Sequence, residues 1–376
     1  MTSQMTDREA AVYDRQIRLW GAKAQARLRS SKVLVCGKFG GVAVELTKNL
    51  VLAGVSCTIQ DSGLTEERDF ACNFFLKQDS AGKNRAEACI DAIRELNPLV
   101  KVECEPRTLT EVLSSDEFMK QFSVVCYTGT CVQDACKVDE LCRERGIFFF
   151  ASASSAFIGY MFSDLGDAHE YVETTKKGEE TSTKKDTAAS CSFDQALRAD
   201  WKTLTMKKRN RVPDTYFALA MMRRGDVVSS SHGDICLEQG VDTSFCDEAS
   251  VAETIATLRA GADISPVCSI LGGIAGQEVI KAISGKDKPI CNFFFYDAMT
   301  TGAGQERRIG LPAEEKKSAP QHQTASNKRK AAEIEIEICL DDDDDNKGSS
   351  ASSKQKITSA QNSSNNDNNV EIIVLD

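Results

Sequence analysis

Short apolar runs alternate with amphipathic stretches through the first half of the chain, and this alternation predicts repeated strand–helix units. Residues 31–37 (SKVLVCG) are typical of a buried parallel strand, and residues 42–54 (VAVELTKNLVLAG) of a helix that ends at a glycine. A second strand over residues 55–61 ends in Asp61. Strand, glycine turn, helix, strand and acid in this order indicate a Rossmann-like unit.

Further elements continue the pattern, with helices predicted at 82–98 and 133–145 and strands at 100–104, 122–127, 147–151 and, running antiparallel, 156–162. The chain is therefore predicted to be α/β, with a Rossmann-like, mostly parallel sheet and helices on both faces. Residues 10–165 are assigned to the first part of this domain.

The pattern changes after this first part, and residues 166–263 are predicted to be a small, mainly helical insert with helices at 193–201, 216–224 and 248–258. Residues 173–188 are charged, rich in Thr and Lys and almost free of large apolar side chains, which predicts a mobile loop. Residues 264–312 are expected to close the sheet domain with a long helix and strands at 292–296 and 307–311.

The long closing helix contains Gly272, Gly273 and Gly276. Glycine in a helix interior costs roughly 1 kcal/mol relative to alanine. Three such glycines indicate that another backbone packs very close to this helix.

After the sheet domain, residues 313–376 are dominated by Ser, Asn, Lys and Asp, which predicts a disordered acidic tail. Two β-branched islands interrupt it, at 334–340 and 370–376. Such a run can add as an edge strand to a partner's sheet, and the candidate residues are Val370, Ile372, Ile373 and Val374. The alternative is a weakly sticky segment that its acids keep soluble.

Composition excludes several classes of protein. A formal net charge of −10 over 376 residues argues against a general nucleic-acid binder. No apolar run reaches the roughly 18 residues that span a bilayer, and the N-terminus has no signal-peptide core, so no membrane association is expected. The 15 cysteines form no CxxC pair and only three histidines accompany them, so no zinc or other metal site is expected and the thiols should be reduced and mostly buried.

The stretch YDRQIRLWG at 13–21 carries the main candidate chemistry. Three apolar residues fall at i, i+4 and i+7 and would form one stripe on a helix: Tyr13, Ile17 and Trp20. Arg15 and Arg18 would point away from the stripe, and the planar fork of an arginine matches phosphate oxygens. The stripe can dock the segment while a guanidinium is held outward. The alternative is an ordinary amphipathic helix with two solvated arginines.

The turn after the first strand contains Gly37, Gly40 and Gly41 but departs from the GxGxxG pattern. Phe39 stands where the second glycine allows close approach of a phosphate. The turn therefore favours the fold more than a bound nucleotide. Asp61 is a candidate nucleotide contact, although an acid that ends such a strand also occurs without a ligand.

Several motifs in one chain resemble the smaller subunits of SUMO-activating enzymes, in the ThiF/MoeB-like superfamily of activating enzymes. The resemblance covers residues 10–165 and 264–312 and rests on YDRQIRLWG (13–21), KNLVLAGV (48–55), KNRAEA (83–88), PVCSILGGIAGQEVIKAIS (266–284) and NFFFYDAM (292–299).

Members of that family work as heterodimers, in which the larger catalytic subunit holds the complete adenylation site, with ATP and Mg, and the catalytic cysteine. The resemblance implies that this chain binds no cofactor of its own and lends Arg15 across the interface to the ATP phosphates. The interface would be supported by Tyr13, Arg18, Trp20, Gly272, Gly273 and Gly276. The implied partners are the larger subunit, SUMO, which residues 370–374 of the tail would bind, and indirectly a conjugating enzyme.

The resemblance also implies a degenerate nucleotide site and a chain that is inactive alone. Complete members carry arginine and glutamine after the second-strand acid, and Asn73 and Phe74 appear in their place here. A lysine at the start of the next helix appears as Arg85. A buried phenylalanine at 74 would bind neither phosphate nor magnesium.

Cys57 begins a CTIQ stretch that superficially resembles the signature of a thioester cysteine. Its place in an apolar strand predicts a core thiol instead, because a nucleophile must be accessible.

Other functions remain open on the residues alone. A self-sufficient adenylating enzyme of the same fold would need an intact phosphate turn, and so would an NAD-linked oxidoreductase, so Phe39 counts against both. The N-terminus also resembles the equivalent subunit for the modifier NEDD8, but that family carries a much longer insert, which would not fit between Leu165 and Ile264. A short basic stretch, Lys328–Lys330, fits a nuclear location, with the cytoplasm as a second expected location.

Overall fold

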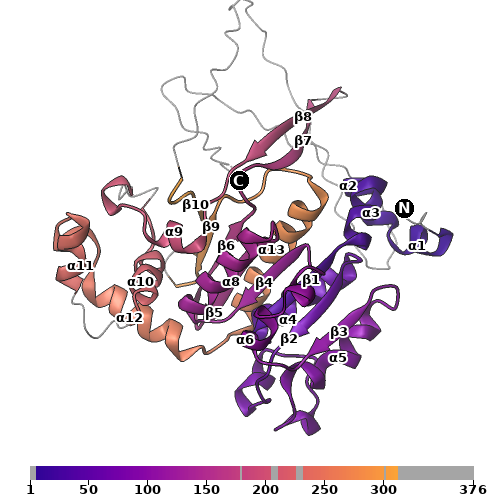
Figure 1. Cartoon of the computed structure of the whole chain (residues 1–376), viewed down its shortest axis with the longest axis horizontal. Coiled ribbons are helices and arrows are strands. Elements are labelled where there is room, and N and C mark those ends of the chain that lie inside the picture. Colours follow the sequence, from indigo (N-terminus) through magenta and orange to yellow (C-terminus); the bar gives the residue numbers. More distant parts are fainter. Residues whose placement is uncertain (1–5, 178–179, 205–210, 226–231, 300–301, 312–376) are drawn as a thin grey trace, which may run out of the picture. The chain divides into compact units, whose positions relative to one another are not determined.

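The computed structural model describes residues 6–177, 180–204, 211–225, 232–299 and 302–311. Its main sheet has eight strands in the order β10-β9-β6-β5-β4-β1-β2-β3 (Figure 1). In chain order these are β1 (Lys32–Gly37), β2 (Ser56–Gln60), β3 (Val102–Glu105), β4 (Val124–Thr128), β5 (Phe148–Ser155), β6 (Ile158–Asp164), β9 (Phe293–Asp297) and β10 (Gly304–Arg307).

Five neighbouring strands pair in parallel, in the order β5-β4-β1-β2-β3. Beyond β5 the sheet continues with β6, β9 and β10, which pair antiparallel. The predicted α/β class with a mostly parallel sheet is therefore confirmed. The helices of the sheet domain are α1 (Asp7–Val12), α2 (Asp14–Trp20), α3 (Ala22–Ser30), α4 (Gly41–Leu52), η1 (Glu67–Ala71), η2 (Gln78–Ser80), α5 (Arg85–Leu96), α6 (Leu109–Leu113), α7 (Asp116–Met119), α8 (Val132–Glu144) and α13 (Ser265–Ser284).

Both faces of the sheet are covered, which explains why its strands are apolar at consecutive positions. Along β1, Val33 and Val35 join a core that α3, α4, α5 and α13 complete. Leu34 and Cys36 point to the other face and join a second core with α8 and the helices of the insert.

The insert packs on the sheet through this second core, and its helices are α9 (Phe193–Leu197), η3 (Trp201–Thr203), α10 (Asp214–Arg223), α11 (His232–Gln239), η4 (Thr243–Phe245) and α12 (Glu248–Ala260). α10 is almost wholly buried and contacts both α8 and α12. The insert therefore shares a core with the sheet domain. α11 was not predicted from the sequence.

The mobile loop predicted over residues 173–188 is wrong. These residues lie in an antiparallel pair, β7 (His169–Lys177) and β8 (Glu180–Ala188), in which His169 stands opposite Ala188. The prediction relied on the absence of alternating apolar residues. A two-stranded ribbon needs no buried face, and threonine is β-branched and therefore suits a strand.

The glycines of α13 have different surroundings. A Cβ added to Gly272 would lie 2.5 Å from the Cβ of Glu45 and 2.9 Å from the backbone nitrogen of Leu46, so α13 and α4 approach closely here. A Cβ at Gly276 would lie 3.0 Å from the side chain of Asn49. The expectation is wrong for Gly273, because no described atom lies within 4 Å of a Cβ added there. Successive residues of a helix are rotated by about 100°, so Gly273 faces away from α4 although Gly272 faces it.

α13 also corrects the expectation that no apolar stretch is long enough to cross a membrane. Within its 20 residues, a stretch of 18 has a mean hydropathy of 1.3, which meets that test of length and composition. Of that stretch 56% is buried, where α13 packs on α3, α4 and β5. A core helix passes the same test, and this burial is what a core helix shows.

The predicted tail over residues 313–376 lies outside the described residues, as do its candidate binding residues Val370, Ile372, Ile373 and Val374.

Gly272→Ala should lower the midpoint of guanidinium unfolding of the full-length chain, whereas Gly273→Ala should keep or raise it. A methyl group at 272 meets the backbone of α4, and overpacking of this kind costs about 1–3 kcal/mol. Alanine at an open helical position gains up to about 1 kcal/mol over glycine. Circular dichroism follows both unfolding curves. Equal midpoints for the two variants would show that α13 does not approach α4 this closely.

Candidate functional site

The N-terminal segment is docked on the body through Tyr13 and Trp20. Tyr13 is 1% exposed, and its hydroxyl accepts a hydrogen bond of 2.9 Å from the Asn97 amide. The Trp20 indole N–H donates to the Gln25 side chain at 2.9 Å. The Gln25 amide in turn donates to the carbonyl oxygen of Ala53 at 2.8 Å. The apolar stripe thus lies against α3 and the end of α4.

Two exposed arginines of α2 differ in their contacts. Arg18 pairs with Asp14 one turn earlier, at 3.0 Å between nitrogen and oxygen. Arg15 makes no hydrogen bond or ion pair with any residue that the structure describes. Of the two, Arg15 is therefore the guanidinium that is free to meet an external anion.

The glycine turn follows β1 and is built into the core. Gly37 has a φ of 104°, and a Cβ there would lie 2.4 Å from the carbonyl oxygen of Thr128, so only glycine fits. Phe39 is 1% exposed and belongs to the core shared with α4. The side chain at the position of the missing second glycine therefore serves packing.

Carboxylates of the same chain occupy the amides of this turn. The Phe39 N–H donates to Asp61 at 2.8 Å, and the Gly41 N–H donates to Asp263 at 3.1 Å. A Cβ added to Gly40 would lie 2.7 Å from the same Asp263 oxygen. In a nucleotide-binding turn, amides at a helix N-terminus face the phosphates of the ligand. Here two of them already have anionic partners.

Arg85 is buried between two acids of the same region. Its Nη1 lies 2.5 Å from Asp61 Oδ2, and its Nε lies 2.8 Å from Asp69 Oδ2. Its Nη2 donates to the carbonyl oxygen of Leu64 at 2.9 Å. The guanidinium is thus already paired within the chain and is not free to bind a phosphate.

Arg85 and Asp69 stabilise one another in their charged forms. Burial alone would raise the pKa of Asp69, but the hydrogen bond from the backbone at Glu66 and the adjacent Arg85 lower it below its ordinary value. Burial alone would lower the pKa of Arg85, which Asp61 and Asp69 raise instead. The pair therefore stays ionised at neutral pH.

Asn73 and Phe74 have different surroundings. Asn73 is 2% exposed; its amide donates to the Phe39 carbonyl at 3.4 Å and its oxygen accepts from the Phe75 N–H at 3.2 Å. The expectation of a buried Phe74 is wrong, because this ring is 54% exposed and the Lys48 ammonium lies 5.4 Å from its centre. Phe75 is the buried ring of the two.

Arg15 and the glycine turn lie toward opposite ends of α4. The turn precedes the first residue of that helix, whereas a Cβ on Gly54, just after its last residue, would lie 2.9 Å from the Tyr13 hydroxyl. The 12 residues of α4 span about 18 Å. Arg15, two residues from Tyr13, is therefore held away from the turn of its own chain.

Cys57 is a core thiol, as predicted. It is completely buried in β2 between Val33 of β1 and Val102 of β3. Burial raises its pKa to about 12, which is the opposite of what a nucleophile needs.

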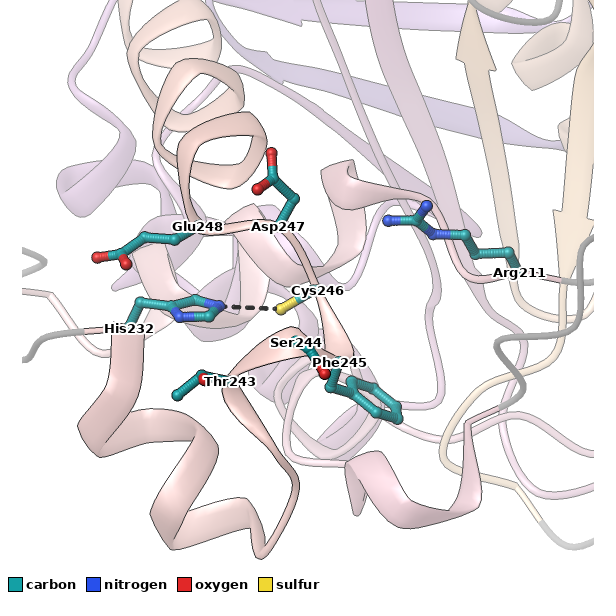
Figure 2. Close-up of a pocket in the computed structure, with 8 residues that line it drawn as sticks. All are labelled: Arg211, His232, Thr243, Ser244, Phe245, Cys246, Asp247 and Glu248. Carbon is teal, nitrogen blue, oxygen red and sulfur yellow. Dashed lines mark hydrogen bonds between the residues drawn. The ribbon is translucent and has the colours of Figure 1, made fainter.

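Two features escaped prediction. Asp263 lies 222 residues beyond Gly41, so no local pattern links them. His232, Cys236 and Cys246 converge in the insert beside a cavity of about 640 Å³ (Figure 2), although no CxxC pair is present. The spacing of His232 and Cys236, one helical turn apart, is the signal in the sequence that could have identified them.

Known proteins are similar in sequence to this chain along most of its length. Residues 13–319 match the ThiF family. SUMO-activating enzyme subunit 1 of Xenopus tropicalis is 34% identical over 333 residues, which cover 79% of this chain and 95% of that protein. The Homo sapiens protein of the same name is 32% identical over 335 residues, covering 78% and 94%. The chain belongs to the ThiF family, in the SUMO-activating enzyme subunit 1 group.

One further relative and one solved structure are also similar to this chain. The Dictyostelium discoideum SUMO-activating enzyme subunit 1 is 33% identical over 312 residues, covering 78% of this chain and 92% of that protein. The crystal structure of PaaA matches 82% of this chain and 76% of its own with a TM-score of 0.52 at 16% identity. This last likeness shows the fold alone.

Arg85→Gln should lower the free energy of unfolding at pH 7 by about 3–5 kcal/mol, because it removes the cation that buried Asp61 and Asp69 share and leaves Asp69 with the more distant Lys38, at 3.4 Å. The difference in free energy of unfolding between Arg85→Gln and wild type should become smaller in acid. The pKa of Asp69 is lower in the folded chain, so the stability that its ion pair contributes is complete above the unfolded value of about 3.9 and disappears as the pH falls through the folded value. Urea unfolding between pH 7 and pH 3 measures this.

Arg68→Gln is the matched control for this measurement. Arg68 pairs with Glu66 at 2.6 Å, but their side chains are 60% and 54% exposed, and such a pair contributes about 1 kcal/mol or less. A loss for Arg85→Gln no larger than that of the control, or one that does not change with pH, would contradict the role given to Arg85.

Proposed function

We propose that this chain is the subunit without the thioester cysteine in a heterodimeric SUMO-activating enzyme, and that it supplies Arg15 in trans to the ATP phosphates held by a larger subunit. ATP and Mg bind in the partner's site in this proposal, and the chain alone is inactive. The names of its relatives, SUMO-activating enzyme subunit 1, support the substrate class and the existence of a second subunit.

One observation carries the proposal: the chain fills its own phosphate turn with acids, while its docked helix presents an arginine that pairs with none of the described residues. Asp61 and Asp263 bind the amides of the turn, and Arg85 is buried among carboxylates. Arg15 is exposed and lies toward the other end of α4. A guanidinium in this position suits an anion outside the chain. The adjacent Leu19, 78% exposed, offers apolar surface that a partner would cover.

The chemistry explains why such an arginine is useful. The C-terminal carboxylate of the modifier attacks the α-phosphorus of ATP, the bond to the β,γ-diphosphate breaks, and an acyl-adenylate and pyrophosphate form. A thiolate of the partner then displaces AMP and takes the acyl group as a thioester. Negative charge grows on the leaving diphosphate in the first step, and a preorganised guanidinium stabilises that transition state more than the ground state.

Two further parts of the proposal concern residues outside the described chain. Val370, Ile372, Ile373 and Val374 would add to SUMO as an edge strand, and a conjugating enzyme would meet the complex only indirectly. The basic stretch Lys328–Lys330 supports a nuclear location, and the cytoplasm is the second location in this proposal.

The isolated chain should show no modifier-dependent ATP–pyrophosphate exchange, because the donors of its turn are already bound to its own acids. Addition of the larger subunit of a SUMO-activating enzyme should produce exchange. Strong exchange by the pure chain would favour a self-sufficient adenylating enzyme, and tight binding of NAD by the chain would favour an oxidoreductase.

Arg15→Ala should lower adenylation in the assembled enzyme by about 10- to 1,000-fold, the usual effect of losing one preorganised charge donor. The heterodimer should still form, because Tyr13 and Trp20 keep the segment docked. Single-turnover adenylation and gel filtration of the same samples measure the two properties.

Arg18→Ala is the control for this experiment, on the same helix and equally charged. Arg18 is already paired with Asp14, so its loss should change the rate less. If Arg15→Ala assembles normally and reacts at the wild-type rate, the arginine does not act in trans and the segment serves docking alone.

A further inference from the structure

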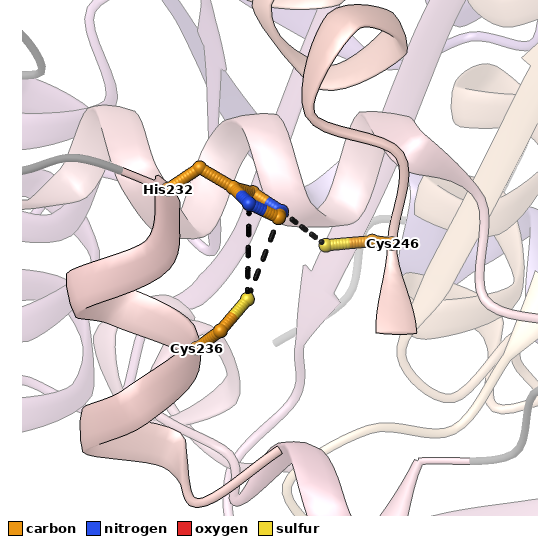
Figure 3. Close-up of side chains that lie close together, drawn as sticks. All are labelled: His232, Cys236 and Cys246. Carbon is orange, nitrogen blue, oxygen red and sulfur yellow. Dashed lines mark hydrogen bonds between the residues drawn. The ribbon is translucent and has the colours of Figure 1, made fainter. Parts of the chain in front are cut away.

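Three buried side chains of the insert converge on one point (Figure 3). His232 and Cys236 lie one turn apart on α11 and so share one face of that helix. Cys246 follows η4 and precedes α12. The three residues are 7%, 0% and 1% exposed, respectively.

The distances between their ligand atoms fit a tetrahedral metal ion. Nε2 of His232 lies 3.3 Å from Sγ of Cys246 and 3.7 Å from Sγ of Cys236. With Zn–N bonds of about 2.0 Å and Zn–S bonds of about 2.3 Å, neighbouring ligands of a tetrahedron are about 3.5–3.8 Å apart. All three atoms lie within 4.8 Å of one another. Small shifts of the side chains would therefore complete three corners of such a site.

We propose that His232, Cys236 and Cys246 bind a zinc ion whose fourth ligand is water. Thiolate and imidazole ligands select zinc over magnesium or calcium, which take oxygen ligands. Two cysteines, one histidine and a water molecule form a zinc ligand set that other proteins use. This site contains none of the residues of α2 or the glycine turn, so it does not depend on the proposed function.

The charges of these groups suit a buried zinc ion. Two thiolates balance the charge of a divalent cation, so the complete site is neutral and its burial costs little. Cysteine binds zinc as a thiolate, so Cys236 and Cys246 must each lose a proton when the ion binds. Zinc must displace these two protons, so its binding should strengthen as the pH rises.

The cavity beside the cluster gives water access to the fourth position. His232 and Cys246 line this cavity of about 640 Å³ together with Asp247 and Glu248 (Figure 2). The Asp247 carboxylate already accepts a hydrogen bond from the Ser250 N–H at 3.0 Å, where it caps α12. Among the described residues, His232, Cys236 and Cys246 are those whose ligand atoms lie within 4.8 Å of one another, so neither Asp247 nor Glu248 belongs to the cluster.

A zinc ion here would connect α11 to the segment that begins α12. Cys236 and Cys246 already belong to the core that the insert shares with the sheet. α11 has only eight residues, and a helix of this length is not stable by its own hydrogen bonds. An ion that binds the folded chain and not the unfolded one stabilises it by mass action. The role of the site is therefore to hold α11 in place.

Metal content of the full-length chain tests the proposal directly. The chain is expressed with zinc in the medium, freed of any affinity tag and gel-filtered, and about one zinc per chain is expected by elemental mass spectrometry. Replacement of zinc by cobalt(II) should give thiolate-to-cobalt charge-transfer absorption and the intense visible bands of tetrahedral cobalt. Cys246→Ser and His232→Asn should lose the zinc and these bands.

Cys131→Ser is the matched control, because Cys131 is exposed and lies outside the cluster. It should keep both the zinc and the cobalt spectrum, and a strong chelator should lower the Tm of this variant and of wild type but not that of Cys246→Ser. Only trace zinc and no thiolate–cobalt absorption in the wild-type chain would overturn the proposal, even if the variants fail to fold. Zinc content unchanged by Cys246→Ser would overturn it as well.

Discussion

The close packing of α4 against α13 is the constraint on which both the glycine turn and the docked N-terminal segment depend. Gly272 lets the two backbones approach, and α4 and α13 share one core with the same face of the sheet, so α4 is fixed on both neighbours. Its first residue ends the glycine turn, and the glycine after its last residue receives the Tyr13 ring. Any shift of α4 would therefore move the filled turn and the docked arginine segment together.

Charge explains why the turn keeps its shape without a nucleotide. A triphosphate would have to displace Asp61 and Asp263 from the amides and then lie beside them, and like charges at such distances repel strongly. Asp61 is also paired with Arg85, and Asp263 accepts a hydrogen bond from the Ser154 hydroxyl at 2.6 Å. The fold survives because it rests on the apolar cores, whereas nucleotide binding needs only a few polar atoms to be free.

The sequence predicts those parts of the structure that depend on neighbouring residues. Apolar runs identified the strands because both faces of the sheet are buried, and the spacing in 13–21 identified the docking stripe. Contacts between residues far apart in the sequence could not be predicted, such as the hydrogen bond between Asp263 and Gly41, which are 222 residues apart. Adjacent rings were equally ambiguous, since nothing local decides that Phe75 points inward and Phe74 outward. The β7–β8 ribbon was missed because residues 173–188 are charged and almost free of large apolar side chains, so no apolar alternation marks the two strands.

An arginine that acts on an external anion must be held by a rigid support and must lack a partner of its own. The hydrogen bond between Tyr13 and Asn97, and the chain of bonds from Trp20 through Gln25 to the end of α4, supply the support. Arg15 and Arg18 differ in their ion pairs, because Arg18 has Asp14 four residues earlier, a spacing that stabilises an ion pair on a helix. The turn of the same chain lies toward the far end of α4 and is already filled with acids. The charge of Arg15 is therefore directed outward by the arrangement of the whole domain rather than by its own exposure.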